Sequence, residues 1–335
     1  PRAAAAAEPE PEEEELGPKF EGETLILSSP GDLEKVLKNL RGYKTRGIFK
    51  NIRKIIFEKN ITIIPNGAGK LLRELENLES IQGDGVVTVE SYAFDSCENL
   101  VTVKLPNAVT IGEVAFGDCY NLKEIEIPKV TTIKVGAFRS CHGLTEIEFP
   151  LVSTVEGMAF VSCERLKRVK LPLVSTIKGY AFADCRSLNK VELPNATTIE
   201  KGVFRDCHSL DKIEFPKVVT VGETALRDCA LKEIALPAAT TIEKEAFKGC
   251  RRLKKIELPR VTVIKTNTFE DCENLEEVIA PEVTNVEDYA FKNCKNLVQL
   301  DFSPTRSLDS YALKDTNIVN ENGVLISNVP NPKLN

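Results

Sequence analysis

The chain has 335 residues and a formal net charge of −6, of which residues 1–20 supply −4 because six glutamates there are balanced only by Arg2 and Lys19. The remaining body is nearly neutral, so it lacks the clustered Lys and Arg residues with which a nucleic-acid-binding surface neutralises phosphates. No apolar run reaches the roughly 18 residues of a membrane-spanning helix, so we expect no membrane-spanning segment and no nucleic-acid partner.

Residues 1–20 form the first expected region of the chain. They are rich in Glu, Pro and Ala and poor in apolar bulk, a composition that cannot bury enough surface to order itself. We therefore expect a disordered acidic leader or tether. The chain begins at Pro1 and shows no basic-then-apolar signal segment, so we interpret it as a processed or trimmed form whose signal or anchor is absent.

Residues 21–81 are expected to form an N-terminal cap with one short helix and degenerate repeats. Ser29 is the expected N-cap of this helix, and Gly42 is expected to end it. Two later stretches, residues 52–64 and 75–81, keep part of a pattern that becomes regular further along the chain. A cap of this kind covers the open end of a stacked repeat array.

From residue 82 to residue 302 a 22-residue pattern repeats, with the consensus L-x-x-I-x-L-P-x-V-x-T-I-x-x-x-A-F-x-x-C-x-x. All ten cysteines of the chain obey it: Cys97, Cys119, Cys141, Cys163, Cys185, Cys207, Cys229, Cys250, Cys272 and Cys294. Eight of the nine spacings are 22 residues, and the spacing from Cys229 to Cys250 is 21 because one residue is missing between Cys229 and Leu231. A fixed period predicts one elongated repeat domain rather than several globular ones.

Each unit predicts a short β-strand followed by a buried aromatic residue and a corner. The alternating L-x-x-I-x-L segment is typical of a strand with one buried face, and the proline after it lacks an N–H donor and should end the strand. The A-F pair places a ring in the interior, and burial of one ring contributes roughly 1.5–3 kcal/mol. The rings are Phe94, Phe116, Phe138, Phe160, Phe182, Phe204, Phe247, Phe269 and Phe291. Ser, Asp, Asn or Gly comes directly before each cysteine, so each cysteine is expected to follow a corner of the coil.

Residues 303–335 are expected to form a divergent C-terminal capping repeat. They keep Ala312 and Leu313 at the A-F position, but Thr316 stands where the pattern places cysteine. Departure from the consensus is typical of the terminal units that close a repeat array.

The cysteines admit three interpretations: buried free thiols, disulfides and metal ligands. Zinc sites use C-x-x-C pairs or Cys with His, and the sequence has no C-x-x-C. Equivalent side chains of stacked strands stand about 4.7–4.9 Å apart, whereas the Cβ atoms of a disulfide need about 3.5–4.5 Å. We therefore favour free thiols that pack as small buried apolar groups, with disulfides as the alternative.

No catalytic constellation can be assembled from the sequence. The two histidines, His142 and His208, each follow a repeat cysteine and lie three units apart, which corresponds to about 14–15 Å at the strand spacing. They cannot share a metal ion, and the cysteines are expected to be buried, so no base lies within reach of a nucleophile. We predict a non-enzymatic protein with no cofactor and no metal site.

The consensus, carried by ten consecutive units, resembles the leucine-rich repeats of the BspA-like bacterial surface proteins. The resemblance implies an α/β-type repeat solenoid: a right-handed leucine-rich-repeat superhelix with a parallel concave β-sheet and short turns or helical turns on the convex side. It also implies secretion or cell-surface display and a role in adhesion to host or microbial surface proteins. The family shares a scaffold motif rather than a binding motif, so the resemblance carries over no site residue.

The concave sheet is the surface that carries the candidate binding residues, because alternate strand residues of successive units line up there. Acidic residues gather on two neighbouring units and mixed charges on the next three. The candidate binding residues are Glu124, Glu126, Glu146, Glu148, Arg168, Lys170, Lys190, Glu192, Lys212 and Glu214. Such a groove would steer a charged protein partner, whereas a sheet whose neighbouring charges compensate each other would have no ligand.

Two hypotheses of function follow. The first is a monomeric, surface-displayed binding or adhesion module that recognises a protein partner through the repeats. The second is a structural spacer or scaffold of the cell envelope with no specific ligand on the repeats.

Overall fold

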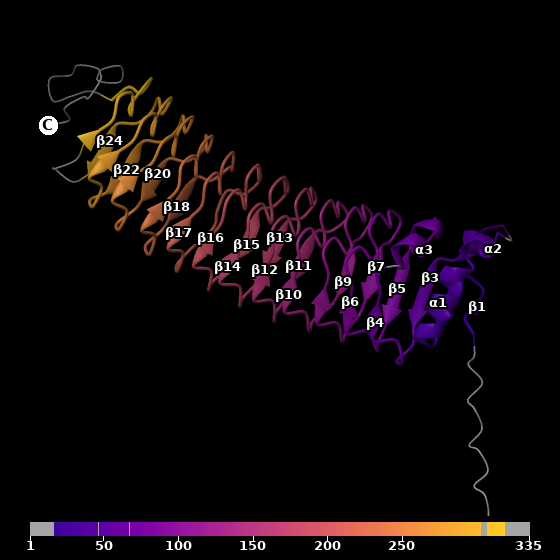
Figure 1. Cartoon of the computed structure of the whole chain (residues 1–335). Helices are drawn as coiled ribbons and strands as arrows, with labels where there is room; N and C mark the ends of the chain where they lie inside the picture. The colour runs from indigo at the N-terminus through magenta and orange to yellow at the C-terminus, as the bar shows by residue number, and fades with distance from the viewer. Residues whose placement is uncertain (1–16, 46, 67, 303–306, 319–335) are drawn as a thin grey trace, which may run out of the picture.

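The computed structural model describes residues 17–45, 47–66, 68–302 and 307–318, which form an elongated, gently curved stack of coils (Figure 1). The solenoid of parallel strands expected from the sequence is confirmed. Residues 1–16 of the expected leader lie outside the described residues, as do residues 303–306 and 319–335 of the expected closing repeat.

The N-terminal end combines a short antiparallel strand pair with helices. β1 (Lys19–Glu21) pairs with β2 (Thr24–Leu27), and β2 pairs in parallel with β3 (Lys54–Phe57). The other elements of this end are α1 (Pro30–Lys38), α2 (Leu40–Thr45), the 3-10 helix η1 (Ile48–Asn51), β4 (Ile63–Ile64) and α3 (Ala68–Glu74). β3 and β4 join the same parallel pairings as later strands, since β3 pairs with β5 and β4 pairs with β6.

The capping of α1 is confirmed at its start and differs from the expectation at its end. The Ser29 hydroxyl accepts a hydrogen bond from the Asp32 N–H at 3.2 Å, and the Asp32 carboxylate accepts one from the Ser29 N–H at 3.1 Å, which is a capping box. The expected stop at Gly42 is wrong, because α1 already ends before Asn39 and Gly42 lies inside α2. The Asn39 side-chain amide donates to the Lys35 carbonyl at 2.9 Å, so a terminal carbonyl is satisfied without a glycine.

One side of the array, here called the long-strand face, carries the strands predicted from the L-x-x-I-x-L segments. They are β5 (Ser80–Gly83), β7 (Thr102–Lys104), β9 (Glu124–Glu126), β11 (Glu146–Glu148), β13 (Arg168–Lys170), β15 (Lys190–Glu192), β18 (Glu233–Ala235), β20 (Lys255–Glu257), β22 (Glu277–Ala280) and β24 (Gln299–Phe302). Paired neighbours are parallel and oppose equivalent residues of successive units. The face is divided into three sheets, β1-β2-β3-β5-β7-β9, β11-β13-β15 and β18-β20-β22-β24.

A second parallel ladder, here called the short-strand face, arises from the V-x-T-I segments, for which the sequence predicted no strand. Its further strands are β6 (Thr88–Val89), β8 (Thr110–Ile111), β10 (Thr132–Ile133), β12 (Thr154–Val155), β14 (Thr176–Ile177), β16 (Thr198–Ile199), β17 (Thr220–Val221), β19 (Thr241–Ile242), β21 (Val263–Ile264), β23 (Asn285–Val286) and β25 (Ser307–Leu308). A nine-stranded sheet runs from β4 to β19, and β21, β23 and β25 form a separate sheet. The second residue of each strand is buried, so this side also contributes to the core.

The third side of each coil is a turn edge that contains the A-F pair and the corner before the cysteine. The Phe160 N–H donates to the Ala181 carbonyl of the next coil at 2.8 Å, and the Ser162 N–H donates to Ala183 in the same way at 2.8 Å. Ser162 has a φ of 60°, and the residues before the other nine cysteines also have positive φ. The predicted corner is therefore confirmed, and its short polar residues and glycine are types that tolerate the left-handed conformation.

Replacing Ser162 with valine is expected to destabilise the chain by about 1–2 kcal/mol, because a β-branched side chain is strained in the left-handed region. Ser162→Gly should leave the stability nearly unchanged. Denaturant unfolding followed by circular dichroism measures both. The matched control is Ser153→Val on the solvent-exposed surface, where equivalent positions of other units carry Val109 and Val219. Equal losses for the two valine variants would contradict the explanation by backbone conformation.

The core is dominated by a column of phenylalanine rings. Consecutive rings are nearly parallel, and their centroids lie between 5.0 Å (Phe94 to Phe116) and 5.7 Å (Phe182 to Phe204) apart. Leu226 takes the place of a ring and interrupts the column once. All of these side chains are buried, so stacking of adjacent coils creates an interior that a single unit cannot form.

Candidate functional site

The ten candidate binding residues lie together on the long-strand face. They occupy the first and third positions of β9, β11, β13 and β15 and the equivalent positions of residues 211–215. Nine of them are exposed and Glu192 is half-buried. The middle residue of each strand points into the core, as the buried Ile147 and Val169 illustrate. The alternation read from the sequence is confirmed.

The register of the strands places acidic residues of β11 opposite basic residues of β13. Glu146 and Arg168 are partners with an ion pair of 3.9 Å, and Glu148 and Lys170 are partners with one of 2.6 Å. The hydrogen bond that Lys170 donates to Glu148 raises the pKa of the lysine. Exposed pairs of this kind contribute little to stability. Their effect is to neutralise the middle of the face.

Two further ion pairs form within single units. Lys190 contacts Glu192 at 2.9 Å, and Lys212 contacts Glu214 at 3.2 Å. The hydrogen bond from Lys190 lowers the pKa of the Glu192 carboxyl. Eight of the ten candidate residues are thus charge-compensated.

Glu124 and Glu126 differ from the other eight. Both are exposed, and within the described part of the chain neither forms an ion pair. Their strand, β9, ends one sheet, and the next strand with two glutamates, β11, begins another. Like charges on directly opposed strands disfavour pairing, which accounts for a division at this position. The result is an acidic position on the face, at β9, whose two carboxylates form no ion pair among the described residues.

A cleft opens in the long-strand face on the far side of β15. It has a volume of about 700 Å³ and is lined by residues 189–194 and by Lys212, Ile213, Glu214 and Pro216. Residues 211–215 keep the alternating sequence of a strand but form none, and β15 is the last strand of its sheet. The cleft therefore lies where one strand of the ladder is missing.

The cleft coincides with the most irregular unit of the array, residues 210–230. This unit lacks the long strand, carries Leu226 instead of a ring, and ends at the shortened corner Cys229-Ala230-Leu231. In several other units the deleted position holds an asparagine that ties the corner to the preceding coil, as when the Asn121 amide donates to the Glu98 carbonyl at 2.9 Å. The 21-residue cysteine spacing was the sequence signal for this irregularity, although it did not predict a cleft.

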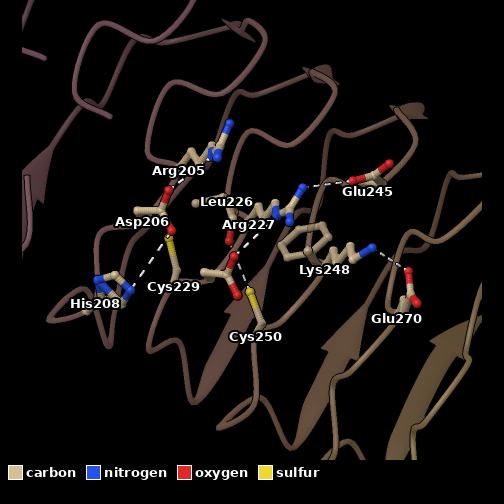
Figure 2. A network of polar contacts seen from close by, with 12 residues as sticks. Arg205, Asp206, His208, Leu226, Arg227, Cys229, Glu245, Lys248, Cys250 and Glu270 are labelled. Atoms are coloured by element: carbon tan, nitrogen blue, oxygen red, sulfur yellow. Dashed lines mark hydrogen bonds and ion pairs between the residues drawn. The ribbon is translucent and has the colours of Figure 1, made fainter. Parts of the chain in front are cut away.

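The cysteines form a buried column of free thiols on the turn edge, as the sequence analysis favoured. Nine of them also donate a hydrogen bond to the carbonyl at the ring position of the preceding coil, for example Cys229 to Phe204 at 3.1 Å. Figure 2 shows the equivalent bond from Cys250 to the Leu226 carbonyl, also at 3.1 Å. Sequence reasoning missed this role and treated the thiols as packing groups only. The fixed spacing of Cys after Phe was the available signal.

The chemistry of these thiols is set by their burial. Burial raises the pKa of Cys97, Cys163 and Cys250 to about 12 and raises that of the other seven as well. A protonated thiol is neither a nucleophile nor a good metal ligand. Among the described residues no group of three or more His, Cys, Asp and Glu is arranged to hold a metal ion.

The two histidines occupy corner loops, as expected. The ring of His142 stacks on Tyr120 with centroids 5.3 Å apart, and its Nδ1 lies 2.9 Å from the Ser162 carbonyl. His208 lies 3.9 Å from Asp206 (Figure 2). Both rings are accounted for by local contacts on the turn edge, away from the charged face.

The fold and the repeated motif together define a leucine-rich-repeat solenoid. The sequence matches the BspA type leucine rich repeat region over residues 48–167, 131–241 and 219–323. Because these overlapping stretches span most of the chain, the chain belongs to the BspA-type leucine-rich-repeat family. A comparison with curated proteins gives no match.

Several solved bacterial structures are similar. A leucine-rich repeat protein from Bacteroides ovatus is 25% identical, with a TM-score of 0.54 over 69% of this chain and 69% of that chain. One from Eubacterium ventriosum is 18% identical, with a TM-score of 0.41 over 89% and 91%. A leucine rich cell surface protein from Faecalibacterium prausnitzii is 21% identical, with a TM-score of 0.34 over 70% and 81%. In the described part of this chain, no helix combines the length and apolar character that crossing a membrane requires.

Proposed function

We propose that this chain is a non-enzymatic binding module, displayed at the cell surface or secreted, that recognises a protein partner through its long-strand face. The observation that carries the proposal is that Glu124 and Glu126 form no ion pair among the described residues, whereas the other eight candidate residues are paired. An isolated region of one charge attracts an oppositely charged partner and speeds association. Membership of the BspA-type leucine-rich-repeat family supports the location.

A structural spacer is the second candidate. It is favoured by the backbone pairing on two faces and the turn edge, which together hold each described coil of the repeats to the next. A spacer needs no ligand on its repeats, so the two candidates differ in whether exposed charges of the long-strand face affect any association.

Charge reversal at Glu124 and Glu126 is expected to slow the association of a partner at least about tenfold at low salt, because the steering charge changes sign. Partners would be selected from a displayed peptide library on the wild-type chain. Their association rates with the double variant Glu124→Lys, Glu126→Lys would then be measured by surface plasmon resonance at two ionic strengths.

The matched control changes the same net charge away from this pair. Glu98 and Glu164 are exposed corner residues, so Glu98→Lys with Glu164→Lys tests whether overall charge alone explains the effect. Equal rates for the wild type and the Glu124, Glu126 double variant would favour the spacer.

A further inference from the structure

We propose that the cleft between β15 and residues 211–215 receives an extended peptide segment of the protein partner, which pairs with the backbone of β15 as an added strand. The segment carries an acidic, a β-branched and a basic residue in succession at its centre. This inference rests on the proposed function, because it names the chemistry by which the same face recognises its partner.

The first support is the free backbone edge of β15. The Lys190 N–H donates to the Lys167 carbonyl at 3.0 Å, and the Leu171 N–H donates to the Glu192 carbonyl at 3.1 Å, so Lys190 and Glu192 direct their backbone groups toward β13. Backbone groups of successive strand residues point to opposite sides. The N–H and C=O of Val191 therefore point toward the cleft, where the described residues supply no strand partner. Peptides bind to such edges by strand addition.

The second support is the shape of the cleft. Its volume of about 700 Å³ is in the range of ligand-sized pockets. Val191, Leu193 and Ile213 form an apolar floor, and Pro194 and Pro216 line its end. A β-branched residue at the centre of an inserted strand would lie over this floor, since alternate residues of a strand face the same side.

The third support is that the cleft is preformed. On the short-strand face the same two units remain paired in register, with Thr198 opposite Thr220. In the turns that follow Pro194 and Pro216, the Lys217 ammonium donates to the Asn195 side-chain oxygen at 2.6 Å. The two coils are thus held together behind the cleft and separated only at its mouth, so binding does not have to open them.

The charges at the mouth of the cleft determine the order of the acidic and basic residues along the peptide. Lys190 and Lys212 stand at equivalent positions of their units, and Glu192 and Glu214 stand at the next outward-facing positions. An inserted strand meets a lysine on both sides at one outward position and a glutamate on both sides two residues later. An acidic residue therefore fits the first position and a basic residue the second, in a segment that runs parallel to β15. Exposed pairs add modest affinity, so this arrangement mainly provides specificity.

The test uses the acetylated and amidated heptapeptide TVDVKVT with the full chain, in which Asp and Lys face outward and the valines face inward. Isothermal titration should show binding of TVDVKVT, with at least about tenfold weaker binding of TVKVKVT and TVDVDVT. N-methylation of the peptide's lysine should weaken binding about tenfold or more, because in a parallel pairing that N–H donates the hydrogen bond to the Val191 carbonyl of β15. Equal binding of the N-methylated peptide, or no binding of TVDVKVT, overturns the inference.

Variants of the chain test the same site from the other side. Lys190→Glu with Lys212→Glu should weaken TVDVKVT about tenfold and make TVKVKVT the preferred peptide. The matched control is Lys104→Glu with Lys255→Glu, which changes equal charges on β7 and β20, and circular dichroism verifies that both double variants fold. Similar losses in the two double variants overturn the proposed site.

The experiment also separates this inference from the function on which it rests. One outcome is a library-selected partner that depends on Glu124 and Glu126 for its association and yet is not displaced by TVDVKVT. That result supports the proposed function as a binding module and contradicts the proposal that the cleft is its peptide site. Competition by TVDVKVT, with loss of partner binding in the Lys190, Lys212 variant, supports both.

Discussion

Raising the pH from about 8 to about 10 is expected to lower the free energy of unfolding by roughly 10 kcal/mol, because the ten buried thiols cannot ionise while the chain is folded. Burial holds the pKa of Cys97, Cys163 and Cys250 at about 12, above the ordinary value of 9.0. In the unfolded chain the same thiols ionise near pH 9. A pKa raised by folding gives stability that is complete below the unfolded pKa and is lost as the pH rises toward the folded one. Each thiol contributes about 1.4 kcal/mol of this loss over the whole interval, because the slope of about 1.4 kcal/mol per pH unit is reached only above the unfolded pKa.

The measurement is the melting temperature as a function of pH, followed by circular dichroism together with the ultraviolet absorbance of thiolate. Melting temperatures are preferred because a repeat array need not unfold in one step. Replacing every second cysteine with alanine should halve the slope above pH 9; the positions are Cys119, Cys163, Cys207, Cys250 and Cys294. A melting temperature that stays constant between about pH 8 and 10, or thiolate absorbance that rises before unfolding, would contradict the prediction.

Phe160→Ala is expected to cost about 3–5 kcal/mol, the second large effect, because it opens a cavity in the ring column. The Phe160 ring is fully buried and stacks between Phe138 and Phe182, with centroid distances of 5.3 and 5.2 Å. Since each coil contacts only its neighbours, the damage should be local as well as global. Denaturant unfolding measures the loss, and limited proteolysis should place new cleavage sites between residues 138 and 182.

The chain itself supplies the matched control for this prediction. Leu226 occupies the ring position of its own unit and is fully buried, so Phe160→Leu copies a substitution the fold already contains. It should cost less than about 1.5 kcal/mol. If leucine and alanine at this position were equally destabilising, stacking of the ring rather than filled volume would control stability, and the cavity argument would be wrong.

The repeat made much of the fold predictable, because errors at one unit are corrected by the others. The sequence repeats the long-strand pattern and the corner before the cysteine in ten units and the ring in nine of them, and stacking in register follows from the fixed spacing. The charged face was predictable for the same reason: in a strand with one buried face, Glu146 and Glu148 must both point outward when Ile147 points inward.

The sequence did not predict the short-strand face, the missing strand at residues 211–215 or the end of α1. These features depend on hydrogen bonds that a pattern of apolar residues does not encode. Strands of two residues, such as Thr176–Ile177, are too short to alternate, so the short-strand face had no periodic signal. Residues 211–215 alternate as well as any strand does, yet they form none, because pairing is decided by neighbouring coils. Gly42 had the identity of a helix stop, but Asn39 provides the cap earlier. The cleft and the unpaired glutamates therefore emerge only from the assembled array.

The interruptions of the two faces never fall between the same coils. The long-strand pairing is broken between β9 and β11, where β10 and β12 of the same coils are paired. It is broken again after β15, where β16, β17 and β19 are paired in sequence. The short-strand pairing is broken between β19 and β21, where β18 and β20 of the same coils are paired. The breaks in the two ladders are therefore staggered along the axis of the solenoid. Two successive coils that lack strand pairing on one face are thus still paired on the other face. The solenoid can bend where one ladder is broken, while the second ladder keeps the two coils from separating under a force along the axis.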